Sequence, residues 1–367
     1  MSSSWAASRR GSPSPPPLTD ETHSRPNQPL LAEIDRSGER PRGGCVTFDG
    51  PGGLQWRMDD PPRGALMRVI VLGVPSSAGA YCVGVERAPA ALREAGLIEA
   101  LRAAGNEVVD AGDLTTRRWF PDHESPYAQN LNDEAAAMVE LSAAAAERFA
   151  AGGRLLVLGG SCTVAFGMCA AMAQLEQTPR IVYIDRHFDL NTPSSTKEGS
   201  LSWMGVAHAL ALDTAAIELS NATGHAPVLH PSNLVYLGVD PAGAATDWER
   251  ERVADLGLAL VDQTALCGDP QAAARQARSR MTSGPFVVHL DVGVLDFLDA
   301  PIAENVNGRN SGPTIDQLEC ALLELLQAPD CWGMSIAQLD PAHAASDPTA
   351  IPRLVSAIAA ALTTDER

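Results

Sequence analysis

Lysine is almost absent from this chain of 367 residues, in which Lys197 is the single lysine among 27 basic residues. Acidic residues number 45, so the formal net charge at pH 7 is −18. A nucleic-acid binder needs a surplus of clustered Lys and Arg to neutralise phosphates, so this composition excludes nucleic acid as a partner. The excess negative charge falls in residues 67–367, because residues 1–66 carry eight arginines and eight acidic residues.

Long apolar runs are also missing. No run approaches the roughly 18–20 residues needed to cross a bilayer, so a membrane-spanning helix is not expected. The N-terminus has two early arginines but no apolar segment after them, so a secretory signal is not expected. The seven cysteines are an odd number, widely spaced and without a CxxC motif. They are therefore expected to be reduced thiols in a cytoplasmic protein.

The first part of the chain differs in composition from the rest. Residues 1–66 hold ten of the 27 prolines together with Ser, Gly and Arg, and they show no sustained apolar period. Such a composition cannot bury a core, so we expect a disordered extension over 1–66. The folded domain is expected to span 67–367, beginning with the apolar run that follows Met67.

From Met67 onward, short aliphatic runs alternate with stretches rich in Ala, Leu and Glu. The expected strands are 68–74, 107–110, 154–158, 181–185, 234–238, 258–262, 286–291 and 333–338. The expected helices are 87–104, 132–151, 163–176, 203–212, 246–256, 270–280, 314–327 and 350–363. Continuous apolar strands separated by amphipathic helices are typical of a parallel sheet covered on both faces. The pattern predicts an α/β fold with three layers, α/β/α, and a mostly parallel eight-stranded sheet.

Polar residues gather where four of these strands end, and ligands of such sheets bind beyond the carboxyl ends of the strands. The sharpest pattern is D-x-H-x-D, formed by Asp185, His187 and Asp189. In extended chain these three side chains share one face. Two carboxylates and an imidazole suit a divalent cation such as Mn²⁺ or Zn²⁺. The alternative is a strand end whose Asp side chains cap the next loop.

Five segments, taken in order, resemble the arginase/agmatinase (ureohydrolase) family over nearly all of 67–367. They read GVPSSAGAYCVGVERAPAALREAGL, LGGSCTVAFG, IDRHFDLNTP, HLDVGVLD and AQLDPAH. The third is similar to the family's D-A-H-x-D-x-N-T-P and is the most specific match. The resemblance implies an arginase-like fold, a small-molecule substrate and metal-dependent hydrolysis of a guanidino- or amidino-type C–N bond. It also implies a homo-oligomer, either a trimer or a hexamer.

By the same resemblance, a family member holds two Mn²⁺ ions with six ligands. Four of these ligands are retained here, namely Asp185, His187, Asp189 and Asp291. The first histidine of the family pattern is replaced by Cys162 and the last aspartate by Gly293. The cofactor implied is therefore one or two divalent ions. Mn²⁺ is implied by the family, and Zn²⁺ or Fe²⁺ suits the thiolate of Cys162.

Two further considerations bear on the metal. His289 lies two residues before Asp291 on the same expected strand, so its imidazole is expected on the same face and could serve as a ligand in place of Gly293. The alternative is a histidine hydrogen-bonded within a crowded strand end. Carboxylates that converge without a counter-charge raise one another's pKa. Because Arg186 is expected to point to the opposite face, at least one cation is expected.

Substrate-side positions are also changed. The family's loop histidine falls on Ser202 and its substrate-facing glutamate on Gln338, whereas Asn191 matches a retained substrate-reading asparagine. Glu198 lies in the loop where similar enzymes read the substrate tail, and Trp203 is expected to flank the pocket.

Three interpretations remain open at this point. The first is a metallohydrolase in which Asp189 and His187 do catalytic work, with Asp189 holding the nucleophile by a hydrogen bond. The second is a non-catalytic relative kept for assembly or ligand sensing. The third is a changed chemistry in which Cys162 attacks an amidine, with His187 or His289 as the base.

Overall fold

The computed structural model describes residues 46–47, 55–56, 66–305 and 310–363. An eight-stranded sheet forms the centre, every strand pair in it is parallel, and the strand order is β4-β3-β5-β10-β9-β6-β7-β8. The strands are β3 (Arg68–Gly73), β4 (Glu107–Asp113), β5 (Arg154–Leu158), β6 (Ile181–Ile184), β7 (Leu234–Val239), β8 (Ala259–Asp262), β9 (Phe286–Asp291) and β10 (Cys331–Ala337). The predicted α/β class with its parallel sheet is confirmed.

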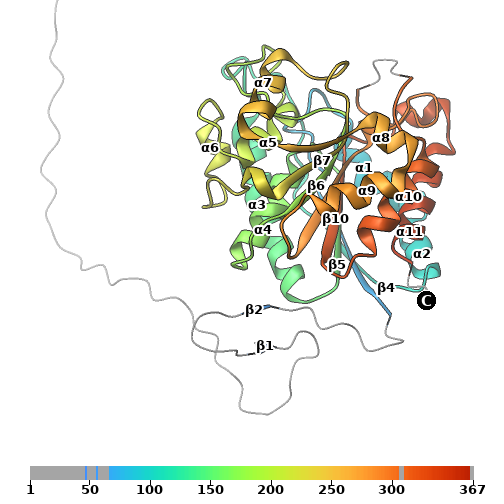
Figure 1. Ribbon diagram of the computed structural model, residues 1–367. Helices are drawn as coiled ribbons and strands as arrows, with labels where there is room; N and C mark the ends of the chain where they lie inside the picture. Colours follow the sequence, from blue (N-terminus) through green and yellow to red (C-terminus); the bar gives the residue numbers. More distant parts are fainter. Residues whose placement is uncertain (1–45, 48–54, 57–65, 306–309, 364–367) are drawn as a thin grey trace, which may run out of the picture. The chain divides into compact units, whose positions relative to one another are not determined.

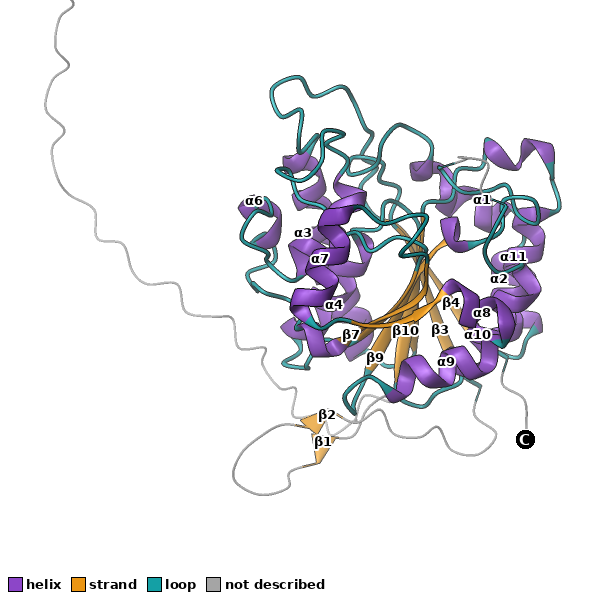
Figure 2. Ribbon diagram, turned by 45° about the horizontal axis from the view of Figure 1, so that its top comes forward, coloured by secondary structure: helices purple, strands orange, loops and turns teal. Residues whose placement is uncertain are grey.

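Helices cover both faces of this sheet (Figures 1 and 2). The α-helices are α1 (Ala88–Glu94), α2 (Leu97–Ala103), α3 (Leu131–Ala150), α4 (Val164–Gln174), α5 (Gly205–Ala209), α6 (Ile217–Ser220), α7 (Asp247–Leu256), α8 (Gln263–Gly268), α9 (Pro270–Ser279), α10 (Ile315–Leu326) and α11 (Ala350–Ala361). Short 3-10 helices are η1 (Val85–Arg87), η2 (Leu201–Met204), η3 (Pro231–Asn233), η4 (Val292–Val294) and η5 (His343–Ser346). None of the described helices combines the length and apolarity needed to cross a membrane.

The sheet divides the core into two clusters because neighbouring residues of a strand face opposite sides. In β3, Val69 and Val71 join the cluster that includes α1, α2, α9, α10 and α11. Ile70 and Leu72 join the cluster that includes α3, α4 and α5. The strands are buried on both faces, which is why they read as continuous apolar runs.

The predicted helices differ from the structure at several points, among them 203–212, where the structure has η2 and the short α5. The helix expected over 87–104 is two helices, because Gly96 adopts a left-handed φ of +88° that no α-helix can continue through. The helices α6 and α8, of four and six residues, were not predicted because they are too short to show a period. Within the predicted disordered extension 1–66, β1 (Val46–Thr47) and β2 (Gln55–Trp56) pair antiparallel. Apart from these strands and Leu66, that extension lies outside the described residues.

Candidate active site

The carboxyl ends of β5, β10, β9 and β6 lie side by side, because these strands are consecutive in the sheet. Their last residues and the loops that follow therefore meet at one edge of the sheet. A pocket lies at this edge, and its polar lining consists of Arg186, His187, Asp189, Asp291, Asn305 and Gln338. Side chains separated by about 150 positions in the chain are thus brought into one site.

Three buried side chains converge at this edge. One ligand atom from each of Cys162, Asp185 and Asp291 lies within 4.8 Å of the other two. The thiol of Cys162 donates to Oδ2 of Asp291 at 3.4 Å. Oδ2 of Asp185 has no hydrogen-bond partner among the described residues. The carboxylates otherwise receive backbone N–H groups, such as that of Gly293 on Oδ1 of Asp291 at 2.6 Å.

Burial makes the charged forms of these groups costly. It raises the pKa of Asp185 to about 7, and burial together with the charge of Asp185 raises the pKa of Asp291 to about 7. Burial, and to a smaller extent the negative charge of Asp291, raises the pKa of the Cys162 thiol well above its ordinary value. A divalent cation would remove this cost, because it favours the deprotonated form of every ligand. The thiol of Cys162 and the carboxylates of Asp185 and Asp291 suit such an ion, and Oδ2 of Asp185 has no other partner among the described residues.

His187 lies beside the three converging groups. Its Nδ1 is 3.3 Å from Oδ1 of Asp185, and its backbone N–H donates to that same oxygen at 2.9 Å. The imidazole stacks on Trp203, with ring centroids 5.9 Å apart and an interplanar angle of 17°. Both rings line the pocket, so His187 connects the carboxylates to the side from which a substrate would enter.

Asp189 is held in an unusual backbone conformation, with φ of +51°. Its carbonyl oxygen accepts the N–H groups of Val206 and Ala207, and its Oδ2 accepts the O–H of Tyr183 at 2.5 Å. Burial and the charge of Asp185 raise the pKa of Asp189 well above its ordinary value. Left-handed conformations of residues other than glycine cost free energy and cluster at functional sites. Asp189 lines the pocket in this conformation.

His289 lies in the interior of the sheet and is not among the pocket-lining residues. It is fully buried in β9, its Nδ1 lies 2.9 Å from Oγ of Ser335, and its ring packs on Tyr183 at 4.4 Å. Its Nε2 has no hydrogen-bond partner among the described residues. Burial lowers the pKa of His289 to about 3, so the imidazole is neutral. Of the predicted metal ligands, the converging set holds Cys162, Asp185 and Asp291, and it does not include His187, Asp189 or His289.

Arg186 differs from the expectation that it points away from the site. The chain bends at Arg186 and His187 once β6 has ended, so the alternation of a strand no longer applies. Arg186 is among the residues that line the pocket, and its guanidinium donates to the carbonyl oxygens of Gly293 at 2.7 Å and Ser311 at 2.5 Å. A fixed positive charge therefore belongs to this site.

The five predicted substrate-binding residues separate into two groups. Trp203 and Gln338 line the pocket, and Oε1 of Gln338 has no hydrogen-bond partner among the described residues. Asn191 is buried and its Oδ1 accepts Oγ of Ser195 at 3.1 Å. Oγ of the buried Ser202 lies 2.7 Å from Oγ of Ser200, and Glu198 is exposed. The last three residues are not among the pocket lining.

Glu134 was not identified from the sequence. This residue of α3 is fully buried and accepts the N–H of Gly79 at 2.8 Å and the hydroxyls of Ser161 at 2.8 Å and of Thr163. Ser76 adds a fourth donor at 3.4 Å. The sequence offered one sign of its role. Glu134 occupies a position on the apolar face of α3, because the buried residues of this helix recur from it at helical spacing. Glu134 fixes the turn that carries Cys162.

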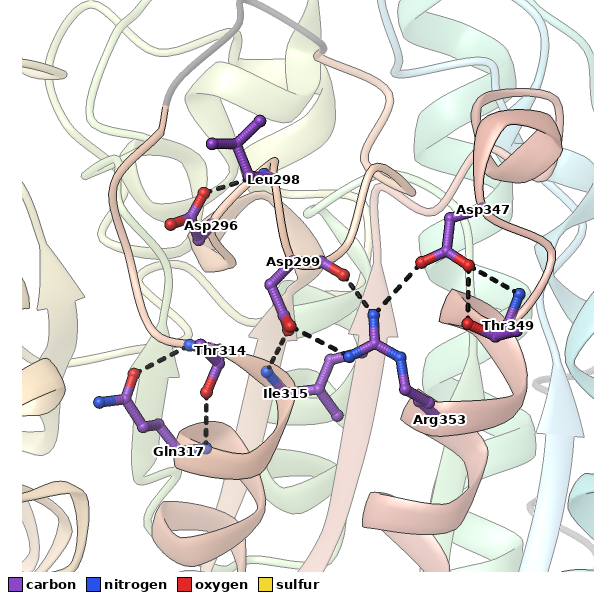
Figure 3. A network of polar contacts seen from close by, with 9 residues as sticks. All are labelled: Asp296, Leu298, Asp299, Thr314, Ile315, Gln317, Asp347, Thr349 and Arg353. Carbon is purple, nitrogen blue, oxygen red and sulfur yellow. Dashed lines mark hydrogen bonds and ion pairs between the residues drawn. The ribbon is translucent and has the colours of Figure 1, made fainter.

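The apolar wall of the pocket comes from the segment after β9. Leu295, Phe297, Ala300 and Ala303 line the pocket from this side. Figure 3 shows how the segment is held: the guanidinium of Arg353 in α11 donates to Oδ1 of Asp299 at 3.0 Å. The other oxygen of Asp299 accepts the N–H of Ile315 at the start of α10, at 2.8 Å. The wall is thus anchored to two helices rather than to the strands that carry the acids.

Comparison with known proteins agrees with this architecture. The arginase family model matches residues 67–363. Arginase-1 of Rattus norvegicus is 34% identical over 179 residues, 47% of this chain and 54% of the relative, so the chain spans about half of that relative's length. Arginase of Bacillus caldovelox is 29% identical over 242 residues, 64% of this chain and 78% of the relative.

Solved structures show the same fold. The arginase structure from Bacillus caldovelox superposes with a TM-score of 0.73 at 22% identity, covering 82% of this chain and 99% of that one. Formiminoglutamase of Trypanosoma cruzi, solved with Mn²⁺, superposes with a TM-score of 0.62 at 16% identity, covering 83% of this chain and 95% of that one. Since the family match covers most of its length, the chain belongs to the arginase family.

Proposed function

We propose that this chain is a metal-dependent hydrolase that cleaves a C–N bond in a guanidino- or amidino-type small molecule. The observation that carries the proposal is the convergence of Cys162, Asp185 and Asp291 beneath a pocket lined by His187 and Asp189. A divalent ion held by these residues would supply an acidified water at neutral pH. Membership of the arginase family supports the same class of reaction.

The residues of the chain have separate tasks in this proposal. Cys162, Asp185 and Asp291 would hold the ion, and His187 lies beside Asp185 on the pocket side. Asp189, fixed by the O–H of Tyr183, accepts a proton at its carboxylate and orients the attacking water. Gln338 is among the pocket-lining residues and its buried Oε1 has no partner among the described residues, so in this proposal it is the acceptor for an N–H of the amidine.

The same residues argue against arginine and agmatine as good substrates. Gln338 offers a neutral amide where the family resemblance places a carboxylate, and Arg186 adds a positive charge to the pocket lining. Both changes weaken the binding of a cationic guanidinium. The half-buried rings of Trp203 and Phe297 line the pocket and favour a less basic or bulkier amidine.

The test is release of urea or ammonia from a panel of guanidino, ureido and amidino compounds, with Mn²⁺, Zn²⁺ and Fe²⁺ supplied separately. We expect turnover of a weakly basic amidine and slow turnover of arginine, since loss of one acid–base group typically costs about 10²–10⁴-fold. Fast arginine turnover would contradict the substrate assignment. No turnover of any compound by metal-loaded protein would contradict the proposal.

A second candidate is a non-catalytic member of the family. Ser202, at the position of the family's loop histidine, is fully buried and engages Ser200 rather than the pocket. Catalysis by the Cys162 thiolate is less favoured, because burial and three neighbouring acids raise the pKa of that thiol. Inactivity of the metal-loaded protein across the panel would support the non-catalytic candidate.

A further inference from the structure

We propose that Cys162 makes this site selective for one thiophilic divalent ion, such as Zn²⁺, Fe²⁺ or Co²⁺, in place of a pair of Mn²⁺ ions. The inference depends on the metal binding in the proposed function and does not depend on the hydrolysis. It rests on which ligand atoms converge and on how the thiol is held.

The converging ligand set combines one sulfur with carboxylate oxygens. Sulfur from Cys162 and oxygens from Asp185 and Asp291 lie within 4.8 Å of one another. Thiolate ligands select zinc and iron, whereas sets of carboxylates and water suit manganese and magnesium. Catalytic zinc sites commonly use three protein ligands and leave a fourth position to water or substrate. Three converging ligands at the edge of a pocket match that number.

Hydrogen bonds of the two flanking residues fix the position of the Cys162 thiol. Ser161 and Thr163, on either side of Cys162, are both hydrogen-bonded to the buried carboxylate of Glu134. Cys162 itself turns toward the acids, with Sγ 3.4 Å from Oδ2 of Asp291. Cys169, one turn into α4, is equally buried, and burial alone raises its pKa to about 12. Burial is therefore common to both thiols, and contact with carboxylates distinguishes Cys162.

The geometry also favours a single ion. Gly293 has no side chain where the family resemblance places a second ligand of the last pair. Its backbone is already engaged, since its N–H donates to Asp291 and its carbonyl accepts Arg186 at 2.7 Å. Among the described residues, one group of three potential ligands converges, and it is the group that contains Cys162.

Cobalt substitution tests the proposal directly, because a thiolate bound to Co²⁺ gives a charge-transfer absorption in the near ultraviolet that carboxylates do not give. The full chain is stripped with a chelator and titrated separately with Co²⁺, Zn²⁺ and Mn²⁺. We expect the band to reach its maximum at one equivalent of Co²⁺. We also expect Zn²⁺ to displace Co²⁺, and Mn²⁺ to bind more weakly than either.

Three variants test whether Cys162 supplies the sulfur that binds the metal. Cys162→Ser should lose the band and weaken Zn²⁺ binding by more than about 100-fold, above the roughly 10–100-fold typical of residues that only support a ligand. Cys169→Ser, a buried thiol away from the acids, should keep both. Cys162→His restores the family's ligand and should raise Mn²⁺ affinity relative to Zn²⁺ without the band, which also covers the case of a serine variant that fails to fold.

Retention of the band and of Zn²⁺ affinity in Cys162→Ser would overturn the proposal, as would tight binding of two Mn²⁺ by the unaltered chain. These outcomes are distinct from failure of the proposed function. A protein that shows the cobalt band but hydrolyses no amidine retains the selective site and loses the assigned reaction. A protein that hydrolyses amidines with two Mn²⁺ keeps the reaction and loses the selectivity.

Discussion

The turn at residues 161–163 contacts two buried carboxylate sites that differ in what surrounds the acids. Ser161 and Thr163 donate to Glu134, which also receives Ser76 and Gly79, so both of its oxygens have donors. Cys162 faces Asp291, and the neighbouring Asp185 keeps one oxygen without a partner among the described residues.

The difference shows how burial alone fails to indicate a functional acid. Burial raises the pKa at both sites, but only at Glu134 do four hydrogen bonds oppose it. A buried carboxyl surrounded by donors is a structural element, because hydrogen bonds within the chain offset part of its desolvation. Asp185 and Asp291 converge with fewer donors, so their raised pKa values persist unless a cation binds, and Asp291 lines the pocket.

The largest effect is expected from Asp291→Ala. It removes one of three converging ligands, so bound metal and amidine hydrolysis should both fall to background, while the metal-free protein stays folded because a costly buried acid has gone. Elemental analysis and circular dichroism measure the two outcomes. Asp340→Ala is the matched control, since Asp340 is also buried, in the loop after β10, but is paired with Arg87 at 2.8 Å. Equal loss of metal in both variants would contradict the comparison.

Glu134→Ala should act on stability instead. Three hydroxyls and one N–H lose their acceptor, which should lower the free energy of unfolding by about 3 kcal/mol. Glu134→Gln should cost less, because the hydroxyls can rotate to accept the new amide N–H groups. Chemical denaturation gives the values. Glu147→Ala on the same helix, at an exposed position, should stay within about 0.5 kcal/mol, and a similar loss there would remove the special role of Glu134.

The pH dependence of the metal-free protein is the third test. In the folded state Asp185 and Asp291 keep their protons up to a pKa of about 7, whereas in the unfolded chain they lose them near their ordinary value of 3.8. Between these values the folded state binds more protons, so the free energy of unfolding should fall as pH rises, by about 1.4 kcal/mol per pH unit for each carboxyl. The contribution of Asp185 and Asp291 to the slope should vanish above pH 7.

Denaturation in a chelator across this range measures the slope. Asp185→Asn should make the slope shallower, because one carboxyl with a raised pKa is removed. A free energy of unfolding that rises between pH 5 and about 7 would show that the two acids are ionised in the folded protein without metal.

The smallest effect is expected from Tyr183→Phe. Loss of its O–H removes the 2.5 Å hydrogen bond to Asp189 and should cost about 1 kcal/mol of stability. Hydrolysis should fall by about 10-fold with bound metal unchanged, because Asp189 loses its fixed orientation. Tyr236→Phe is the control: it loses a comparable bond to the carbonyl of Phe188, so stability should fall equally with a smaller change in rate. Equal rates in the two variants would contradict the role given to Asp189.

The sequence predicts the fold well because the sheet is buried on both faces. All eight expected strands are present, and β5 and β9 match their predicted bounds. Continuous apolar runs report such strands directly. The break at Gly96 was missed because a helical period continues across it, and only the backbone conformation reveals the end of α1.

The site was less accessible to sequence reasoning beyond the acids at the strand ends. The alternation of a strand holds only as far as Ile184, so the placement of Arg186 in the pocket lining depends on a bend that no pattern announces. Asn191 and Ser202 lie close in sequence to the site but are engaged by Ser195 and Ser200. Glu134 contacts the Cys162 turn from a distant helix, which is a property of packing rather than of local sequence.

The apolar wall of the pocket is anchored to α10 and α11, so it can change independently of the strands that carry the acids. Phe297 lies between Asp296 and Asp299, whose carboxylates accept the N–H groups of Leu298 and Ile315. The path of the backbone is thus set by its two acidic neighbours and by Arg353, and the ring of Phe297 takes no part in these hydrogen bonds. Replacing Phe297 therefore exchanges the surface offered to a substrate while the acids on the strands stay in place. Substitutions at position 297, natural or designed, can therefore change substrate specificity while the residues that would bind the metal remain unchanged.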